Sequence, residues 1–308
     1  MARLHGLLVH GNPPDTQRQC SSRRPFHNET AAAARDSNNT PNEGGRSAMN
    51  KPFVIPIDVG DMEWDHSEAL YRQGIGTKVR GKFICWYIGG TDVPILVDSG
   101  FPDEERAKKY HSYVNPSLSL DQQMGNALKK KGINPESVRM IIQTHLHWDH
   151  CGNLNLFPNA QILVSEKDLA YAMNPLPLHY AGYEAFPLGS EPLWIRAMSQ
   201  IKIIKMKEQE VAAGVRIIPA PGHTPGGLAV LLETSDGPYV IAGDVVYMFE
   251  ALNPDSAKKM PFHIPGVFTD VLAIWESIEK VLDLVGGDRK RVLPGHDRLV
   301  FQQESYPK

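Results

Sequence analysis

Apolar residues fall into short runs and a few helical stripes from residue 53 onward. Runs rich in β-branched and aromatic residues predict strands. The predicted strands are 53–57, 82–88, 93–97, 138–144, 160–165, 215–218, 228–233, 239–242 and 291–293. Apolar positions at helical spacing predict helices, and a glycine follows two of these helices. The predicted helices are 121–131, 166–173 and 269–285. Two groups of strands with helices between and after them predict a mixed α and β domain.

The first 48 residues have no such pattern. They are polar and rich in Ser, Asn, Arg and Gly, a composition that cannot bury enough apolar surface to fold. We expect residues 1–48 to be a disordered leader, or else sequence upstream of a start codon assigned too early. The second alternative arises because Met49 directly precedes the first predicted strand. Residues 49–308 are then the predicted folded domain.

Side chains that can bind metal follow several of the predicted strands. Strand 138–144 leads directly into HLHWDH, which contains His145, His147, Asp149 and His150. Other strand ends carry single candidates, which are Asp98 in VDSG, His223 in PGHTPG, Asp244 in AGD and His296 in PGH. Loops at one edge of a sheet can converge on one site while the strands stay rigid. We therefore expect these side chains to lie together.

The HLHWDH cluster predicts a metal site on its own. Three His and one Asp within six residues are an improbable chance grouping in a chain with 12 His. His145 and His147, two positions apart on extended chain, point the same way and can hold one ion. Asp149 and His150 follow a turn and can hold a second. Imidazole and carboxylate ligands suit zinc, with iron, manganese and cobalt left open, because affinity alone does not decide occupancy. Two adjacent metals can share and activate a hydroxide, which predicts a hydrolase.

The motif series resembles the metallo-β-lactamase superfamily. HxHxDH, a lone His in PGHTPG, then GD and PGH follow one another in that order within residues 53–300. The resemblance implies an α+β fold, an αββα sandwich with a dinuclear metal site at the sheet edge, so that residues 49–308 are one hydrolase domain. It further implies the ligand roles, with His145, His147 and His223 on one metal, Asp149, His150 and His296 on the other, and Asp244 bridging them. Asp98 would support the ligand loop, since a metal-bound imidazole needs its other ring nitrogen oriented.

Tyr247 favours one branch of that superfamily. It lies three residues after Asp244, in GDVVY, where N-acyl-homoserine lactonases carry a tyrosine. The resemblance thus implies a quorum-quenching lactonase with two zinc ions per chain, in which Asp149 and Tyr247 are catalytic. A bridging hydroxide would open the lactone ring while the Tyr247 phenol donates to the carbonyl oxygen or developing oxyanion. The alternatives are a pyridoxolactonase-type lactonase, a glyoxalase II-like thioesterase, a hydrolase of an aromatic xenobiotic, and a non-catalytic metal sensor.

Three aromatic-rich segments are predicted to wall the substrate pocket. They are residues 171–198, 61–76 and 248–265, the last through Phe249, Met260 and Phe262. The remaining histidines of the domain are predicted to be surface or pocket-lining residues rather than ligands, namely His66, His111, His179 and His263. Cys151, next to the cluster, is expected to be a small buried neighbour and not a nucleophile.

Composition and charge exclude other partners. The net charge of −3 gives no basic surface of the kind that nucleic-acid binding needs. No apolar run approaches the roughly 18–20 residues of a membrane span. The three cysteines, Cys20, Cys85 and Cys151, are odd in number and widely spaced, which favours a reducing, cytoplasmic compartment over a disulfide framework. The expected partner is a small-molecule lactone or ester, and the family resemblance is compatible with a homodimer.

Overall fold

The computed structural model describes residues 51–308, so the predicted leader 1–48 lies outside the described residues. The first of two sheets has six strands in sequence order. These are β1 (Phe53–Asp65), β2 (Lys78–Gly89), β3 (Ile95–Val97), β4 (Met140–Ile142), β5 (Gln161–Ser165) and β6 (Ile201–Ile204). The pairs from β1 to β3 are antiparallel, whereas those from β3 to β6 are parallel.

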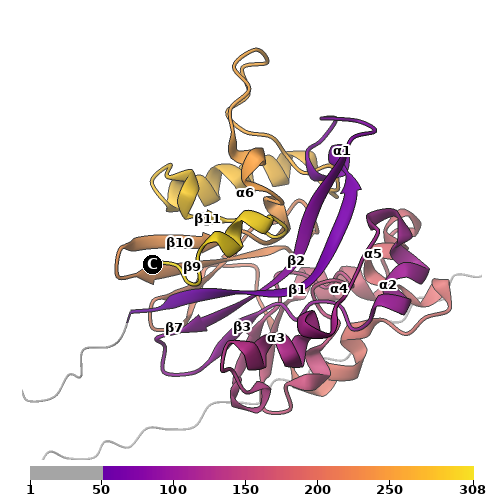
Figure 1. Cartoon of the computed structure of the whole chain (residues 1–308), viewed down its shortest axis with the longest axis vertical. Helices are drawn as coiled ribbons and strands as arrows, with labels where there is room; N and C mark the ends of the chain where they lie inside the picture. Colours follow the sequence, from indigo (N-terminus) through magenta and orange to yellow (C-terminus); the bar gives the residue numbers. More distant parts are fainter. Residues whose placement is uncertain (1–50) are drawn as a thin grey trace, which may run out of the picture. The chain divides into compact units, whose positions relative to one another are not determined.

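The second sheet has five strands in the order β11-β10-β9-β8-β7. They are β7 (Gln209–Ala212), β8 (Val215–Pro219), β9 (Leu228–Thr234), β10 (Gly237–Ile241) and β11 (Val292–Leu293). All pairs are antiparallel except that of β10 with β11. Figure 1 shows this sheet in orange and yellow beside the purple strands of the first sheet.

The two sheets bury a common apolar layer. From β2, the alternate residues Ile84, Trp86 and Ile88 join Ile217 of β8 and Val230 of β9 in one cluster, as the two-residue period of a strand requires. The residues between them face the other way, where Phe83 and Cys85 join a second cluster. β3 and β4 are buried on both faces and read as continuous apolar runs, which is typical of parallel strands.

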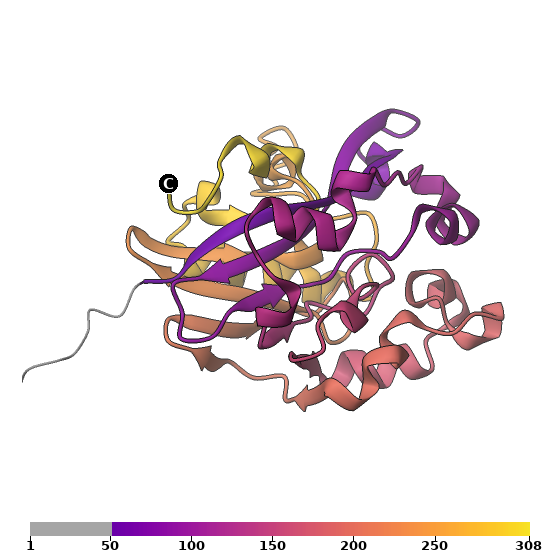
Figure 2. The same cartoon turned by 60° about the horizontal axis from the view of Figure 1, so that its bottom comes forward.

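Helices cover the outer faces of both sheets. They are α1 (His66–Ala69), α2 (Glu104–His111), α3 (Met124–Lys130), α4 (Glu166–Met173), α5 (Tyr180–Tyr183) and α6 (Val271–Leu284). The Asp270 side chain caps α6 by accepting from two backbone N–H groups, and α6 buries Ile274, Ile278 and Val281. In Figures 1 and 2, α6 lies beside the second sheet while α2 to α5 lie beside the first. The predicted αββα sandwich is confirmed.

The sequence prediction differs from the structure in several elements. β1 continues to Asp65, eight residues past its predicted end, because a register shift between Asp58 and Asp61 interrupts the alternation without ending the strand. α2 was not predicted, since it buries only Ala107 and His111. β6 and β7, also not predicted, are edge strands with mostly partly exposed residues. Within residues 51–308, no helix is long and apolar enough to cross a membrane.

Candidate active site

Asp98 anchors the loop that carries the HLHWDH residues. It follows β3 with a left-handed φ of 62°, an uncommon conformation for a residue with a side chain, which costs backbone energy. Its carboxylate accepts hydrogen bonds from Thr144 N, from Thr144 Oγ1 and from His150 Nδ1, each at 2.8 Å. The loop is therefore tied to β3, and the His150 ring is oriented with Nε2 toward the site, as predicted for Asp98.

Backbone carbonyl groups orient two further histidines. His223 Nδ1 lies 3.0 Å from Val267 O, and His296 Nδ1 lies 3.0 Å from Lys82 O. Each ring donates from Nδ1, so its Nε2 lone pair faces the centre of the site. His223 comes from the loop between β8 and β9, and His296 follows β11. The second sheet thus supplies its ligand-type residues in a fixed tautomer.

All seven predicted ligand residues lie together. They form three groups whose ligand atoms lie within 4.8 Å of one another, namely His145 with His147 and His223, His145 with His150 and Asp244, and Asp149 with His150 and His296. The two carboxylate oxygens of Asp244 face different groups. Asp244 Oδ2 lies 3.4 Å from His223 Nε2, and Asp244 Oδ1 lies 3.2 Å from His296 Nε2. Asp244 occupies the position between the groups that a bridging residue needs.

Three buried atoms at this centre have no hydrogen-bond partner. They are His145 Nε2, His150 Nε2 and Asp244 Oδ1. Burying a polar atom without a partner costs free energy, so such atoms need an explanation. Each belongs to a group of His and Asp residues that could hold a metal ion. Divalent metals would satisfy all three atoms, and the donor set of imidazoles and carboxylates suits them.

The charges of the site divide the histidines into two kinds. Burial, with the neighbouring His150 and His147, lowers the pKa of His145 well below its ordinary value, so its ring is neutral. Burial also acts to lower the pKa of His150, but the carboxylates of Asp244, Asp149 and Asp98 raise it well above that value. Burial by itself would raise the pKa of Asp244, yet His150 and His296 hold it well below the usual range. In the metal-free protein these carboxylates therefore favour a proton on His150 Nε2, at the position that a metal would take when bound.

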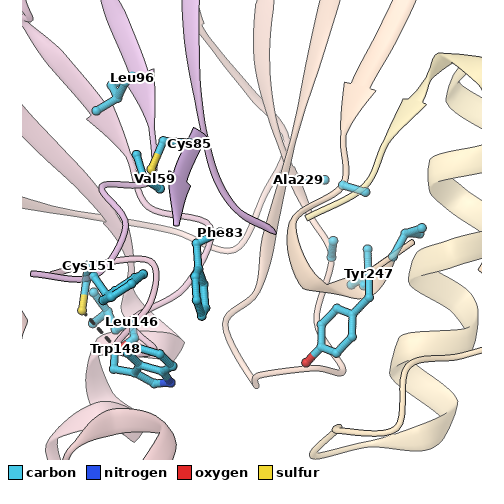
Figure 3. Packing of buried hydrophobic residues seen from close by; sticks show 14 of the residues in the cluster. Val59, Phe83, Cys85, Leu96, Leu146, Trp148, Cys151, Ala229 and Tyr247 are labelled. Carbon is cyan, nitrogen blue, oxygen red and sulfur yellow. Dashed lines mark hydrogen bonds between the residues drawn. The ribbon is translucent and has the colours of Figure 1, made fainter. Parts of the chain in front are cut away.

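A cavity of about 320 Å³ opens onto this centre. Tyr247 lines it, with its Oη 3.3 Å from His223 Nδ1 and its ring stacked on Trp64 at 5.1 Å between centroids. Figure 3 shows Phe83 and Trp148 on the side of the first sheet, with Tyr247 opposite them on the second. Tyr247 therefore faces the cavity beside the ligand groups, where a bound substrate would lie.

Two of the three predicted cavity walls are confirmed. Residues 61–76 contribute Met62, Trp64 and Glu68, and residues 171–198 contribute a segment from Leu178 to Gly182. The third prediction was wrong. Phe249, Met260 and Phe262 do not line this cavity, and Phe262 packs against Trp275 at 4.4 Å between centroids. Val267 and the pair Tyr113–Val114 close the cavity instead.

Comparison with known proteins places this arrangement in a family. Residues 85–296 match the family model of the Metallo-beta-lactamase superfamily. The chain belongs to this superfamily. An N-acyl homoserine lactonase of Bacillus sp. is 30% identical over 259 residues, covering 81% of this chain and 94% of the relative. N-acyl homoserine lactonase AiiA of Bacillus thuringiensis subsp. kurstaki is 26% identical over 257 residues, with the same two coverages.

A solved structure extends the comparison to the fold. A variant of Bacillus thuringiensis AiiA, with N-decanoyl-L-homoserine bound at its active site, superposes with a TM-score of 0.65 at 25% identity. The match covers 82% of this chain and 96% of the solved chain. This member of the metallo-β-lactamase superfamily therefore shares its fold with that solved structure over most of both chains.

Asp168 is a buried residue that was not among the predicted site residues, and it joins the ligand loop to the segment that contains Tyr183. Asp168 Oδ2 accepts from Leu146 N at 2.7 Å, and Asp168 Oδ1 accepts from Tyr183 Oη at 3.2 Å. Burial raises the pKa of its carboxyl to about 6, although the hydrogen bond from Leu146 N acts to lower it. The only sequence signal is Ser165 three residues earlier, whose Oγ accepts from Asp168 N, as at many ordinary helix starts.

Two of the other four histidines follow the prediction, His263 is partly exposed outside the cavity, and His111 is an exception. His179 lines the cavity, and His66 pairs with Glu250 at 3.1 Å near the surface. His111 was expected at the surface or in the pocket, but it is fully buried. It is bonded to the buried Glu184 at 3.1 Å, a partner 73 residues away that no local pattern indicates. Cys151 is buried as expected, with its Sγ bonded to Leu146 O (Figure 3).

Proposed function

We propose that this protein is a dinuclear zinc hydrolase that opens the ring of N-acyl homoserine lactones. The observation that carries the proposal is the Tyr247 phenol, which lines the cavity beside two sets of ligand-type side chains. The N-acyl homoserine lactonases among its relatives cover most of the chain and support the same substrate class.

The residues fit two metals that share one carboxylate. His145, His147 and His223 would hold one metal and Asp149, His150 and His296 the other, with the Asp244 carboxylate, whose oxygens face His223 and His296, available to either. When bound, the metals supply a Lewis acid for the lactone carbonyl and lower the pKa of a water so that it can attack at neutral pH. The hydrogen bonds to Asp98, Val267 O and Lys82 O keep the ligand rings in place for this.

Tyr247 provides the hydrogen bond that the reaction needs at the carbonyl oxygen. Burial and the nearby carboxylates Asp244 and Asp149 raise the pKa of the phenol well above its ordinary value, so it stays protonated at neutral pH. A protonated phenol can donate to the oxygen on which negative charge develops. Trp64 stacks on the Tyr247 ring and limits its movement.

Asp149 is placed to accept a proton from the attacking water. Its carboxylate lines the cavity and lies 3.6 Å from His150 Nε2 and 3.8 Å from His296 Nε2. Attack forms a C–O bond to the carbonyl carbon, and the ring C–O bond then breaks. The leaving alkoxide takes up the proton, so that the product is an open hydroxy acid containing one added water.

The walls of the cavity suit the acyl chain of such a lactone. Met62, Phe83, Val114 and Leu178 present apolar surface around the polar centre. Its volume of about 320 Å³ is at the lower end for ligand cavities, so it fits a small substrate.

Cys85 and Cys151 are free, buried thiols, which supports the proposal of a cytoplasmic enzyme.

A comparison of two substrate classes tests the proposal. Zinc-loaded protein would be given N-hexanoyl homoserine lactone and an acyl-glutathione thioester at neutral pH, with His145→Ala as the blank. We expect rapid acid release from the lactone alone, absent in the blank. Release from the thioester alone would replace the lactonase with a thioesterase. No release from protein that holds two metals would contradict both.

A further inference from the structure

Glu68 is a carboxylate in the cavity wall that lies outside the set of ligand-type residues. It belongs to α1, directly after β1. Its backbone is fixed, because Gly266 N donates to Glu68 O at 2.9 Å and Tyr71 N donates to Ile264 O at 2.9 Å. A Cβ at Gly266 would lie 2.7 Å from Glu68 Cα, so the two segments are in close contact. The side chain therefore leaves a rigid backbone position toward the cavity.

The Glu68 carboxylate has no partner in the structure. Within residues 51–308, its side chain forms no hydrogen bond or ion pair, although it is half-buried. Burial and the charge of Asp65 raise its pKa, whereas the charge of Lys78 acts to lower it. Carboxylates that are partly removed from water without a counter-charge are costly, so a structure rarely keeps one for packing.

The cavity offers no cation to balance Glu68. Its lining residues include the carboxylates of Glu68, Asp149 and Asp244 but no Lys or Arg. Bound metals would neutralise Asp149 and Asp244, which belong to the ligand groups, and would leave Glu68 as the unmatched charge of the wall. A ligand group that lies along α1 would thus be close to the negative charge of Glu68. The dielectric constant is lower in the cavity than in water, so charge–charge interactions are stronger there.

We propose that Glu68 sets the charge class of the substrate, so that the cavity binds lactones with an uncharged or cationic acyl group and rejects those with an anionic one. This inference rests on the proposed lactonase function. Specificity of this kind comes from a repulsive element built against the wrong ligand as much as from contacts with the right one. The uncharged chain gains the apolar wall of Met62 and Trp64, whereas a terminal carboxylate would also be placed next to Glu68.

Binding of lactam analogues tests the inference without catalysis. In these analogues an N–H group replaces the ring oxygen of the lactone. Three analogues are compared, with acyl chains of equal length that end in a methyl, a carboxylate or an ammonium group. Their affinities for the zinc-loaded protein are measured by calorimetry. We expect the carboxylate analogue to bind at least about tenfold more weakly than the methyl analogue. The ratio of these two affinities should fall about tenfold in Glu68→Gln. Glu68→Lys should reverse the preference.

Glu63→Gln is the matched control. It removes one negative charge from the same strand–helix segment, but Glu63 does not line the cavity and pairs with Arg80 at 3.6 Å. The ratio should be the same in Glu63→Gln as in the unmodified protein. An unchanged ratio in both Glu68 variants, or no binding of the methyl analogue, would overturn the inference. Hydrolysis of the parent lactone, measured in parallel, reports on the proposed function separately, because it does not depend on the ratio.

Discussion

At the scale of single residues, hydrogen bonds to one ring nitrogen of each histidine determine which nitrogen faces the centre of the site. Asp98, Val267 O and Lys82 O each hold the Nδ1 of one histidine, which leaves Nε2 for the centre. Tyr247 is held by stacking on Trp64, with an angle of 21° between the rings. The residues that orient the ligand rings are thus different from the residue that would contact the substrate, Tyr247. Replacing one kind should therefore have a different effect from replacing the other.

Replacing Tyr247 with Phe should separate catalysis from metal binding. The ring keeps its packing on Trp64 and only the hydroxyl is lost. Because one donor to the developing oxyanion disappears, we expect kcat to fall about 10²-fold while metal content stays unchanged. Steady-state kinetics with metal analysis of the same samples would measure both. A Tyr247→Phe enzyme with full activity would remove Tyr247 from the mechanism.

Metal binding should release protons at neutral pH. The pKa of His150 in the metal-free protein is raised well above its ordinary value, so His150 holds a proton there that an incoming metal must displace. Apparent zinc affinity should therefore rise with pH until that raised pKa is reached, and should fall as pH drops below it. Calorimetry at pH 7 in buffers of different ionisation enthalpy counts the protons. Finding none released would show that His150 is already neutral.

At the scale of elements, a buried charge network holds the segment around α5 against the site. Glu184, directly after α5, accepts from Arg106 Nε of α2 at 2.5 Å and bonds to His111. His111 stacks on Trp148 with 3.9 Å between centroids and 5° between ring planes. Trp148 lies between His147 and Asp149 and donates from its N to Gly182 O at 2.9 Å. The segment and the ligand loop thus share one support.

Replacing Glu184 with Ala should destabilise the fold strongly. It leaves Arg106 and the fully buried His111 without their acceptor, and breaking a buried charged pair costs about 3 kcal/mol or more. Urea unfolding of the metal-loaded proteins would measure the change. Glu191→Ala is the control, because that side chain is exposed and, among residues 51–308, pairs only with Arg196. Equal stabilities for the two variants would show that the buried network contributes nothing.

The parts that sequence predicted are those with local signals. α4 begins and ends at the predicted residues, because Ser165 caps it and its apolar positions are periodic. The ligand residues were found because they are chemically distinctive and follow strands. Arg106, Glu184 and Asp168 were missed because such residues are usually solvent-exposed, and their partners lie 15 to 78 residues away. Only the tertiary structure brings these partners together.

At the scale of the whole described domain, the candidate site depends on both sheets. The loop after β4 brings His145, His147, Asp149 and His150 from the first sheet. The second sheet brings His223, Asp244 and His296 from the loops that follow β8, β10 and β11. The cavity is likewise shared, since Phe83 of β2 faces Tyr247 across it (Figure 3). Opening a lactone ring on this site would thus require the packed sandwich as a unit.

Identification of the reaction product tests the central claim most directly. Zinc-loaded protein would be incubated with N-hexanoyl homoserine lactone in ¹⁸O-water, and the product would be analysed by mass spectrometry. The account predicts a single product that has gained one labelled water, that keeps its acyl amide, and that closes to the lactone again on acidification. Free hexanoic acid with homoserine lactone, or unchanged substrate from protein holding two metals, would contradict it.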